Sequence, residues 1–327
     1  MRALVYDTSG PGSGELRVAQ LPDPVPGPGE VRVRIAWSGI NHTDVKARAR
    51  RRRDSPPFVV PNQDGAGYID QVGDGVSSDR LGQPVWLYHA AHERQMGTAA
   101  EYTCVPQELA VPLPGVVELV HGATLGIPAI TAHRCLTLGH GPAGRTVLVT
   151  GGAGAVGNAA IQLARWMGAA RVVATASDAY KARLADEAGA HVTLNYRHED
   201  FGAQLSDAAP DGVDLVVDVA VASNLASYLD SMNVHGEISS YASIGSPLLV
   251  EISPLMRRNI ALRFCHVYST PEQGIRRAVD EISAALRGSA LRPLPLHRFA
   301  LEDADHAYES CAGGVVGRTL LDVGRGP

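Results

Sequence analysis

Several residue types and patterns are scarce in this sequence of 327 residues, and each scarcity narrows what the protein can be. No apolar run of about 18 residues occurs, so we expect no transmembrane helix and no membrane partner. The chain starts on a strand-like segment in place of a signal peptide, which predicts a cytoplasmic protein. The four cysteines are too far apart for a disulfide framework or a zinc knuckle; they are Cys104, Cys135, Cys265 and Cys311.

The sequence also has no large excess of either positive or negative charge. The chain has 29 Lys and Arg against 34 Asp and Glu, a net charge of −5. This balance argues against nucleic acid as a partner. Lysine itself is rare, because only Lys46 and Lys181 occur and nearly all other positive charge is arginine. Apolar residues are plentiful at 45%, enough for a sizeable core and too many for a disordered chain.

The length suggests about two domains, and the first 118 residues have the pattern of a β-rich one. Short alternating segments lie near glycine, proline or aspartate, as strands of a barrel-like antiparallel domain do. The strands that we expect are Val31–Ile35, Ala66–Val72, Pro84–Tyr88 and Glu101–Val105.

The pattern changes near residue 120, where short apolar strands begin to alternate with helices. Such alternation over about 145 residues predicts an α/β fold, a Rossmann-type doubly wound parallel sheet. We place this domain at 119–267. The remaining segment, 268–327, is too short for a domain of its own and is expected to return to the first one.

A glycine-rich turn lies between the strand Thr146–Thr150 and a helix that follows it. Gly152, Gly154 and Gly157 have the G-x-G-x-x-G spacing, with Ala155 and Val156 between them. In this context glycines let the backbone approach a pyrophosphate, and the helix supplies free N–H groups. The alternative is a tight turn that needs glycine only for packing.

The end of the next strand indicates which dinucleotide is bound. An NAD site normally has an acidic residue here, whereas this strand ends in small residues and Ser177. Lys181 follows four positions later and could pair with the 2′-phosphate of NADPH. Asp178 is the opposing observation, because its carboxylate could bind the ribose hydroxyls instead.

These segments together resemble the medium-chain dehydrogenase/reductase superfamily, most of all its zinc-free quinone oxidoreductase branch, the zeta-crystallin-like enzymes. The resemblance covers essentially the whole chain. It implies a GroES-like β-barrel made from both chain ends and a Rossmann domain between them. It also implies a homodimer or a tetramer, of which we expect the homodimer. The matching segments are Pro26–Arg34, Gly39–Asp44, Gln63–Gly67, Gly126–Ala132, Thr150–Gly157 and Asn195–Arg197.

The resemblance also implies roles for individual residues. Asn41 and Thr131 would lie near the nicotinamide, and Asp64 close to the cleft. Lys181 and Tyr196 match positions that hold the 2′-phosphate, with Ser177 nearby. Two backbone stretches would hold the carboxamide, Tyr241–Ile244, which includes Ser243, and Cys265–Val267.

The residue types argue against a zinc site. Zinc-dependent relatives have Cys at the position of Asn41 and a His-Glu pair at Gln63–Asp64, and amide oxygens are poor replacements for thiolate and imidazole. His89 and His92 could suggest a metal, but no thiolate or third ligand accompanies them, so exposed loop histidines are the simpler interpretation. We therefore expect no metal.

Two departures from the branch concern the substrate side. Lys46 stands where many members have Tyr, and His42-Thr43-Asp44 looks more like the loop of alcohol dehydrogenases, in which Thr43 would touch the substrate oxygen and His42 the cofactor phosphates. An arginine run follows, Arg48 and Arg50–Arg53. It is either a solvated segment or a basic lip for an acidic substrate.

The sequence therefore predicts an NADPH-dependent oxidoreductase that transfers hydride to a quinone or an α,β-unsaturated carbonyl without a metal. Hydrogen bonds from the Asn41 amide and the Thr43 hydroxyl would stabilise the oxygen that becomes negative. Water or His42 would supply the proton. The alternatives are a metal-free alcohol or ketone dehydrogenase and a non-catalytic NADPH-binding sensor or scaffold.

Overall fold

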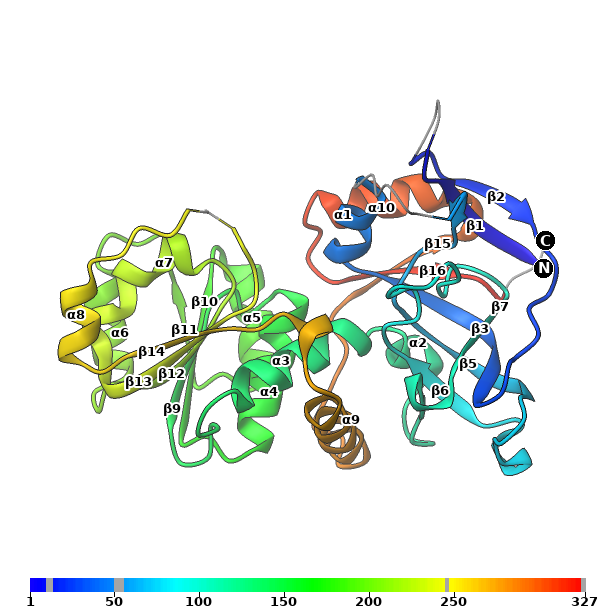
Figure 1. Cartoon of the computed structure of the whole chain (residues 1–327). Helices are drawn as coiled ribbons and strands as arrows, with labels where there is room; N and C mark the ends of the chain where they lie inside the picture. The colour runs from blue at the N-terminus through cyan, green and yellow to red at the C-terminus, as the bar shows by residue number, and fades with distance from the viewer. Residues whose placement is uncertain (10–13, 50–55, 245–246, 325–327) are drawn as a thin grey trace. The chain divides into compact units, whose positions relative to one another are not determined.

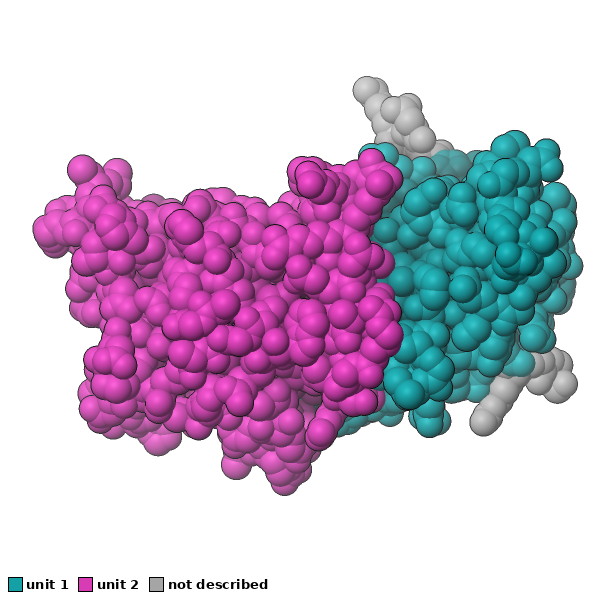
Figure 2. Space-filling model, turned by 90° about the horizontal axis from the view of Figure 1, so that it is seen from below, with its two compact units in different colours: residues 1–127, 295–327 teal, residues 128–294 magenta. Residues whose placement is uncertain are grey.

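The computed structural model describes residues 1–9, 14–49, 56–244 and 247–324, and the chain divides into two compact units (Figures 1 and 2). Unit 1 comprises residues 1–127 and 295–327, and unit 2 comprises residues 128–294. Both chain ends thus contribute to the same unit. Unit 1 is mostly β-structure, whereas unit 2 alternates strands and helices.

Unit 1 contains two sheets. A three-stranded sheet has the order β2-β1-β4, and a seven-stranded sheet has the order β15-β16-β3-β5-β6-β8, with β7 also paired to β3. All pairs are antiparallel except β15 with β16. The strands are β1 Arg2–Asp7, β2 Arg17–Gln20, β3 Glu30–Ile40, β4 Phe58–Val59, β5 Asp64–Val72, β6 Pro84–Leu87, β7 Tyr102–Pro106, β8 Ala110–Pro112, β15 Leu296–Ala300 and β16 Arg318–Asp322.

The core of unit 1 collects the inward-facing residues of both sheets. On β3, Val31, Val33 and Ile35 are buried while Arg34 is exposed, as expected of a strand with one apolar face. They pack with apolar residues of β1 and with Tyr308 of a C-terminal helix. The helices of unit 1 are α1 His42–Ala49, α2 Leu119–Gly122 and α10 Ala304–Ala312, with short 3₁₀ turns η1 Ser78–Arg80, η2 Gln107–Leu109 and η5 Leu301–Asp303.

Unit 2 is built on a six-stranded parallel sheet with the order β11-β10-β9-β12-β13-β14. The order runs outward from β9 in both directions, as in a doubly wound sheet. Its central strands are fully buried apolar runs, because helices cover both faces. The strands are β9 Thr146–Val149, β10 Arg171–Ala176, β11 Val192–Asn195, β12 Val213–Asp218, β13 Met232–Ser240 and β14 Ala261–Phe264.

Helices α3, α4 and α5 lie on one side of this sheet and α6 and α7 on the other (Figure 1). The helix α3 begins in unit 1 and continues into unit 2. The bounds are α3 Gly126–Thr137, α4 Ala155–Trp166, α5 Ala179–Glu187, α6 Phe201–Ala208, α7 Val221–Tyr228, α8 Ile252–Arg257 and α9 Glu272–Arg287, with 3₁₀ turns η3 Leu229–Ser231 and η4 Val267–Ser269.

The units divide at other positions than the sequence suggested. The segment 119–127 lies in unit 1, because Val120 packs against Ala66 and Leu320. The segment 268–294 lies in unit 2, where Gln162 hydrogen-bonds the backbone of Arg292 from both ends of its amide. Specific contacts with distant parts of the chain, rather than local pattern, thus decide which unit these segments join.

Candidate active site

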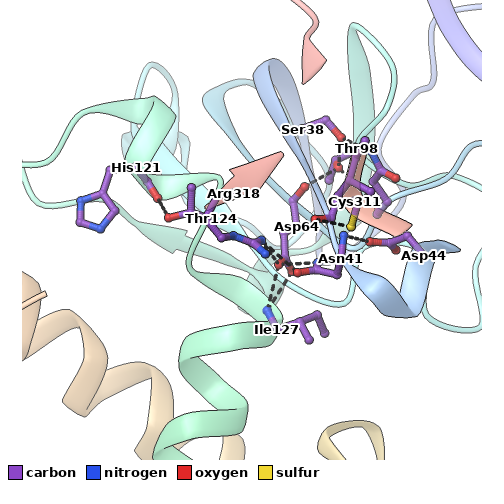
Figure 3. A network of polar contacts seen from close by, with 12 residues as sticks. Ser38, Asn41, Asp44, Asp64, Thr98, His121, Thr124, Ile127, Cys311 and Arg318 are labelled. Atoms are coloured by element: carbon purple, nitrogen blue, oxygen red, sulfur yellow. Dashed lines mark hydrogen bonds and ion pairs between the residues drawn. The ribbon is translucent and has the colours of Figure 1, made fainter. Parts of the chain in front are cut away.

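A buried polar cluster in unit 1 is centred on Asp64, the first residue of β5 (Figure 3). The carboxylate is fully buried and accepts hydrogen bonds from the backbone N–H of Ile127, at 2.9 Å to Oδ1 and 3.0 Å to Oδ2. A Cβ at Gly126 would come within 2.1 Å of Asp64 Oδ1. Glycine at the start of α3 therefore lets the helix approach the carboxylate closely.

The Asn41 amide is held between two charged groups. Asn41 follows the last residue of β3, and its Nδ2 donates to Asp64 Oδ2 at 2.8 Å. Its Oδ1 accepts from the Arg318 guanidinium at 2.9 Å. Since only the nitrogen can donate and only the oxygen can accept, these partners fix the orientation of the amide. The Asn41 side chain also hydrogen-bonds the Asp44 carboxyl, which is one of the causes that lower the pKa of Asp44 against the effect of burial.

Strand pairing brings Arg318 to this cluster. Thr319 pairs with Ile40 in the antiparallel ladder of β16 and β3, so Arg318 lies opposite Asn41. The guanidinium is 3.9 Å from Asp64 Oδ2 and only 8% exposed. Its Nε is buried and has no hydrogen-bond partner among the described residues.

The helix α1 presents the next three residues, which the sequence suggested as a loop. Asp44 is buried, and its Oδ2 accepts from the backbone N–H of Asn41 at 2.8 Å. The Oγ1 of Thr43 is buried without a partner in the described part of the chain, whereas His42 is exposed. Partial desolvation, with the charges of Lys46 and Arg318, lowers the pKa of His42, so its imidazole is mainly uncharged at neutral pH.

Burial is the largest cause of the pKa shifts of the two buried carboxyl groups, those of Asp44 and Asp64. It raises the pKa of Asp44 to about 7, with the charge of Asp64 as the next cause. It raises the pKa of Asp64 to about 6, while Arg318 and the hydrogen bonds from Asn41 and Ile127 act in the opposite direction. The cluster therefore changes its protonation close to neutral pH.

The arginine run divides at the limit of the described residues. Arg50–Arg53 lie outside them. Arg48 is partly buried and bonded within unit 1. Its Nε donates to Gly14 O, and its Nη2 lies 3.4 Å from Asp305 Oδ1. Its guanidinium lies 5.5 Å from the centroid of the Tyr308 ring. Arg48 is thus tied to α10 and is not a free surface charge.

In unit 2 the glycine turn joins β9 to α4. A Cβ at Gly157 would come within 2.3 Å of the Gly151 carbonyl, so glycine is needed for the close approach of helix and turn. Gly151 adopts φ +68°, which also favours glycine. The N-cap of α4 is Gly154, which has no capping side chain, and so the first-turn N–H groups, including those of Ala155 and Val156, are available to an anion.

Asp218, at the end of β12, supports this turn from the neighbouring strand. Its buried carboxylate accepts from Thr150 Oγ1 at 2.8 Å and from Tyr228 Oη at 2.7 Å. Thr150 Oγ1 in turn accepts from Val219 N at 3.0 Å. The turn is therefore held by hydrogen bonds from the protein itself.

Three residues that bear on the choice of cofactor lie just after β10 or in the first turn of α5, namely Ser177, Asp178 and Lys181. Lys181 Nζ donates to Ser177 Oγ at 2.8 Å and lies 3.3 Å from Asp178 Oδ2. Asp178 caps α5 by accepting from Lys181 N at 2.9 Å, and this hydrogen bond is the main reason why its pKa is lowered. Tyr196 is 49% exposed after β11, with the Arg197 guanidinium 6.0 Å from its ring centroid.

The other expected cofactor residues also lie in unit 2. Thr131 is buried on α3, and its carbonyl lies 4.0 Å from Cys265 Sγ at the end of β14. Tyr241 and Ser243 follow the end of β13, and Val267 begins η4. Residues from the ends of β13 and β14 are thus adjacent, because the two strands pair in parallel.

Comparisons with known proteins agree with both halves of this description. Residues 27–115 match the alcohol dehydrogenase GroES-like domain, and residues 155–284 match the zinc-binding dehydrogenase family. The quinone oxidoreductase of Rattus norvegicus is 28% identical over 330 residues, which cover 98% of this chain and 97% of the rat protein. The chain belongs to the medium-chain dehydrogenase/reductase superfamily. Within it, the full-length similarity places the chain in the quinone oxidoreductase branch.

Solved structures of the superfamily have the same fold. The quinone oxidoreductase from Thermus thermophilus, which has also been described in complex with NADPH, is 27% identical with a TM-score of 0.79, over 98% of this chain and 100% of that one. An NAD-dependent alcohol dehydrogenase is 28% identical with a TM-score of 0.86, over 99% and 100% of the two chains. Fold similarity alone therefore does not distinguish the two activities.

The donor set does not suit the catalytic zinc of the superfamily's metal-dependent members. The residues at the expected positions offer amide groups and one carboxylate, and that carboxylate already binds Asn41 and Ile127. A divalent cation at Asp64 would also face the guanidinium of Arg318. Within the described residues, no three His, Cys, Asp or Glu side chains form a group that could hold a metal.

Sequence reasoning missed Arg318 and Asp218. Arg318 lies 277 residues from its partner Asn41, and only the pairing of β16 with β3 brings them together. Asp218 is the last residue of β12, a strand that the sequence predicts. The sequence does not show that β12 pairs with β9, and this pairing brings Asp218 next to the glycine turn. The only sequence signal for either is a charged residue at the end of an apolar strand.

Proposed function

We propose that the protein is an NADPH-dependent oxidoreductase that transfers hydride to a quinone or an α,β-unsaturated carbonyl without a metal. The observation that carries the cofactor assignment is the glycine turn of unit 2 with the Lys181 ammonium held at the end of the next strand. Glycines and the α4 N-terminus suit a pyrophosphate, and Lys181 with Ser177 suits the additional phosphate of NADPH. The full-length relatives that bear the name quinone oxidoreductase support the choice of acceptor.

Bound NADPH would supply the hydride. The chain would supply hydrogen-bond donors to the acceptor oxygen, which gains negative charge. Thr43 Oγ1 is buried without a partner, and a polar group in that state costs about 1–3 kcal/mol. The Asn41 amide, which also hydrogen-bonds the Asp64 and Asp44 carboxyls, is a second donor. Because the lowered pKa of His42 leaves it mainly uncharged, we assign the final proton to water rather than to an imidazolium.

A ketone or alcohol dehydrogenase is the second candidate. It is favoured by the unpartnered Thr43 hydroxyl next to His42 and Asp44, which is the pattern noted for alcohol dehydrogenases. The similarity to an NAD-dependent alcohol dehydrogenase points the same way. In this reading the same hydroxyl would bind the oxygen of a simple ketone.

We further propose a homodimer formed through unit 2. The strand β14 is an edge of the sheet, and an exposed edge is a template for pairing with another chain. Large apolar side chains lie exposed on it and on the segment before it, namely Leu249 (88%), Ile252 (66%), Met256 (69%) and Phe264 (68%). Sedimentation of the purified protein at twice the chain mass would support this assembly, and a monomer at micromolar concentration would contradict it.

The cytoplasmic location stays a prediction from the sequence. All four cysteines are free and buried, which is compatible with a reducing compartment. No helix among the described residues is long and apolar enough to cross a membrane.

The function is tested by following oxidation of NADPH and NADH with three acceptors: a 1,4-quinone, an α,β-unsaturated ketone and a simple ketone. We expect turnover of the quinone or the enone with NADPH. Turnover of the simple ketone alone would favour the dehydrogenase. Tight NADPH binding without turnover of any acceptor would favour a sensor or scaffold and contradict the proposed reaction.

A further inference from the structure

Arg318 is a buried cation that the reaction described above does not use. Its guanidinium donates to Asn41 Oδ1 at 2.9 Å and lies 3.9 Å from Asp64 Oδ2. Burying a charge is costly unless a partner compensates it, and arginine stays protonated even when buried. The positive charge of Arg318 therefore acts on Asn41 and Asp64, the two side chains next to it (Figure 3).

We propose that Arg318 is a positioning residue that acts through Asn41: its fixed positive charge keeps Asp64 ionised and sets the orientation of the Asn41 amide towards the substrate oxygen. The role of Asn41 rests on the proposed function, whereas the charge pairing with Asp64 rests on the structure alone. Neither residue type nor spacing in the sequence assigns this role to Arg318.

The orientation follows from what each partner can accept or donate. With Nδ2 towards Asp64 and Oδ1 towards Arg318, both contacts are favourable. A flipped amide would place its N–H groups against a guanidinium that can only donate, and its oxygen against a carboxylate that can only accept. Two favourable contacts would become two repulsive ones, so one orientation is held as long as both charges are present.

The charges of Asp64 and Arg318 influence each other and are influenced by the groups around them. Asp64 faces Arg318 from β16, the Ile127 N–H from α3 and Asn41 from the end of β3, and it also interacts with the carboxyl of Asp44 on α1. Arg318 interacts in addition with Cys311 on α10 and with His42 on α1. Arg318 is the only full positive charge among these groups at neutral pH, since His42 is mainly uncharged.

Removal of this charge should change the protonation of Asp64. Burial already raises its pKa to about 6 with Arg318 present. An opposite charge at this distance lowers a carboxyl pKa by about 1–3 pH units, so the pKa without Arg318 should lie above neutral pH. A protonated Asp64 donates a hydrogen bond, and the Asn41 amide can then turn its oxygen towards it. The N–H would leave the position that we assign to it.

The experiment compares Arg318→Met, which keeps length and removes charge, with Arg318→Lys, which keeps charge. Arg34→Met is the matched control, because Arg34 is exposed on β3 of the same sheet. At pH 7 we expect Arg318→Met to lower kcat on the order of 100-fold, the scale for losing one positioned donor. KM for NADPH should change less than about 3-fold. The acid limb of the kcat profile should move up by about 1–3 pH units, and Arg318→Lys should restore most of the activity and the original limb.

A second measurement does not depend on activity. Asp64 has a folded-state pKa raised above its unfolded value, so its ionisation opposes folding as pH rises through that range. Arg318→Met raises this pKa further. The loss of Tm relative to the unsubstituted protein should therefore be small near pH 5 and grow towards pH 8. A lost packing contact would lower Tm equally at every pH.

The outcomes distinguish the positioning role of Arg318 from a purely structural role, and both from a failure of the proposed function. A loss of kcat with an unmoved acid limb and a pH-independent loss of Tm would show that Arg318 is structural only, and would overturn the inference. So would a rise of KM for NADPH with kcat unchanged. If the unsubstituted protein turns over no acceptor, the proposed function fails, and the pH dependence of Tm still decides whether Arg318 controls the charge of Asp64.

Discussion

The glycine turn of unit 2 and the polar cluster of unit 1 are built in opposite ways. The turn is one continuous segment, Thr150–Gly157, and it acts through backbone N–H groups and the absence of side chains. The cluster is assembled from residues at 41, 64, 127 and 318, and it acts through side-chain charges. A backbone site depends on local conformation, whereas the cluster depends on the register of distant strands.

This difference leads to different sensitivities. In the turn, an added Cβ at 157 would disturb the backbone, because it would come within 2.3 Å of the Gly151 carbonyl. In the cluster, atoms can be replaced if charge and hydrogen bonding are kept. The turn should therefore respond to volume and the cluster to charge.

The largest effect is expected for Gly157→Ala. The new Cβ would lie 2.3 Å from the Gly151 carbonyl, so α4 has to move away from the turn. We expect NADPH affinity to fall on the order of 100-fold, or about 2.7 kcal/mol, measured by isothermal titration calorimetry. Gly202→Ala is the control, because Gly202 lies on α6 of the same unit and its Cβ would meet nothing closer than 3.8 Å. Equal affinities for both variants would mean that the turn does not hold the cofactor.

A smaller and more selective effect is expected for Lys181→Met. Lys181 would lose a charge-assisted hydrogen bond to the 2′-phosphate, worth about 1.5–3 kcal/mol, so NADPH should bind about 10–100-fold more weakly. NADH, which lacks this phosphate, should bind as before. Arg183→Met controls for the loss of one positive charge on α5, since Arg183 is 63% exposed and pairs with Glu187. An equal loss for both cofactors would remove Lys181 from the phosphate site.

The same contrast explains what the sequence could predict about the fold. The parallel strands of unit 2 appear as short apolar runs next to glycine turns, so local pattern predicts them. The sequence predicts a loop at His42-Thr43-Asp44, whereas the structure has the helix α1 there, which is short and mostly polar with Asp44 as its buried residue. The hydrogen bond from Asn41 N to Asp44 Oδ2 spans only three residues and caps the helix start as in a capping box, so the signal for this helix is local but consists of caps rather than of an apolar pattern.

The residues of the candidate site also divide into those that the local sequence indicates and those that it does not. Residues of one contiguous motif, such as Gly152 and Gly157, could be proposed as cofactor-binding residues from spacing alone. Arg318 could not, because the sequence does not specify that β16 returns to pair with β3. Asn41 and Asp64 came from family resemblance, and the structure adds that each is the other's hydrogen-bond partner. Physical coupling between distant residues is the information that the sequence lacked.

The smallest effect, and the sharpest check on how the cofactor is selected, is expected for Asp178→Asn. Asp178 holds its negative charge through the hydrogen bond from Lys181 N, and it lies 3.3 Å from the ammonium that we assign to the phosphate. The carboxylate therefore competes with a bound phosphate for Lys181 and repels it. Asparagine is an equally good N-cap, so α5 should keep its start. NADPH affinity should rise about 3-fold at low salt, and this gain should shrink at about 0.5 M salt, because exposed charges are screened. NADH should bind no better. Weaker binding of NADH with unchanged NADPH would instead show that Asp178 holds the ribose hydroxyls, and that the end of β10 accommodates either cofactor.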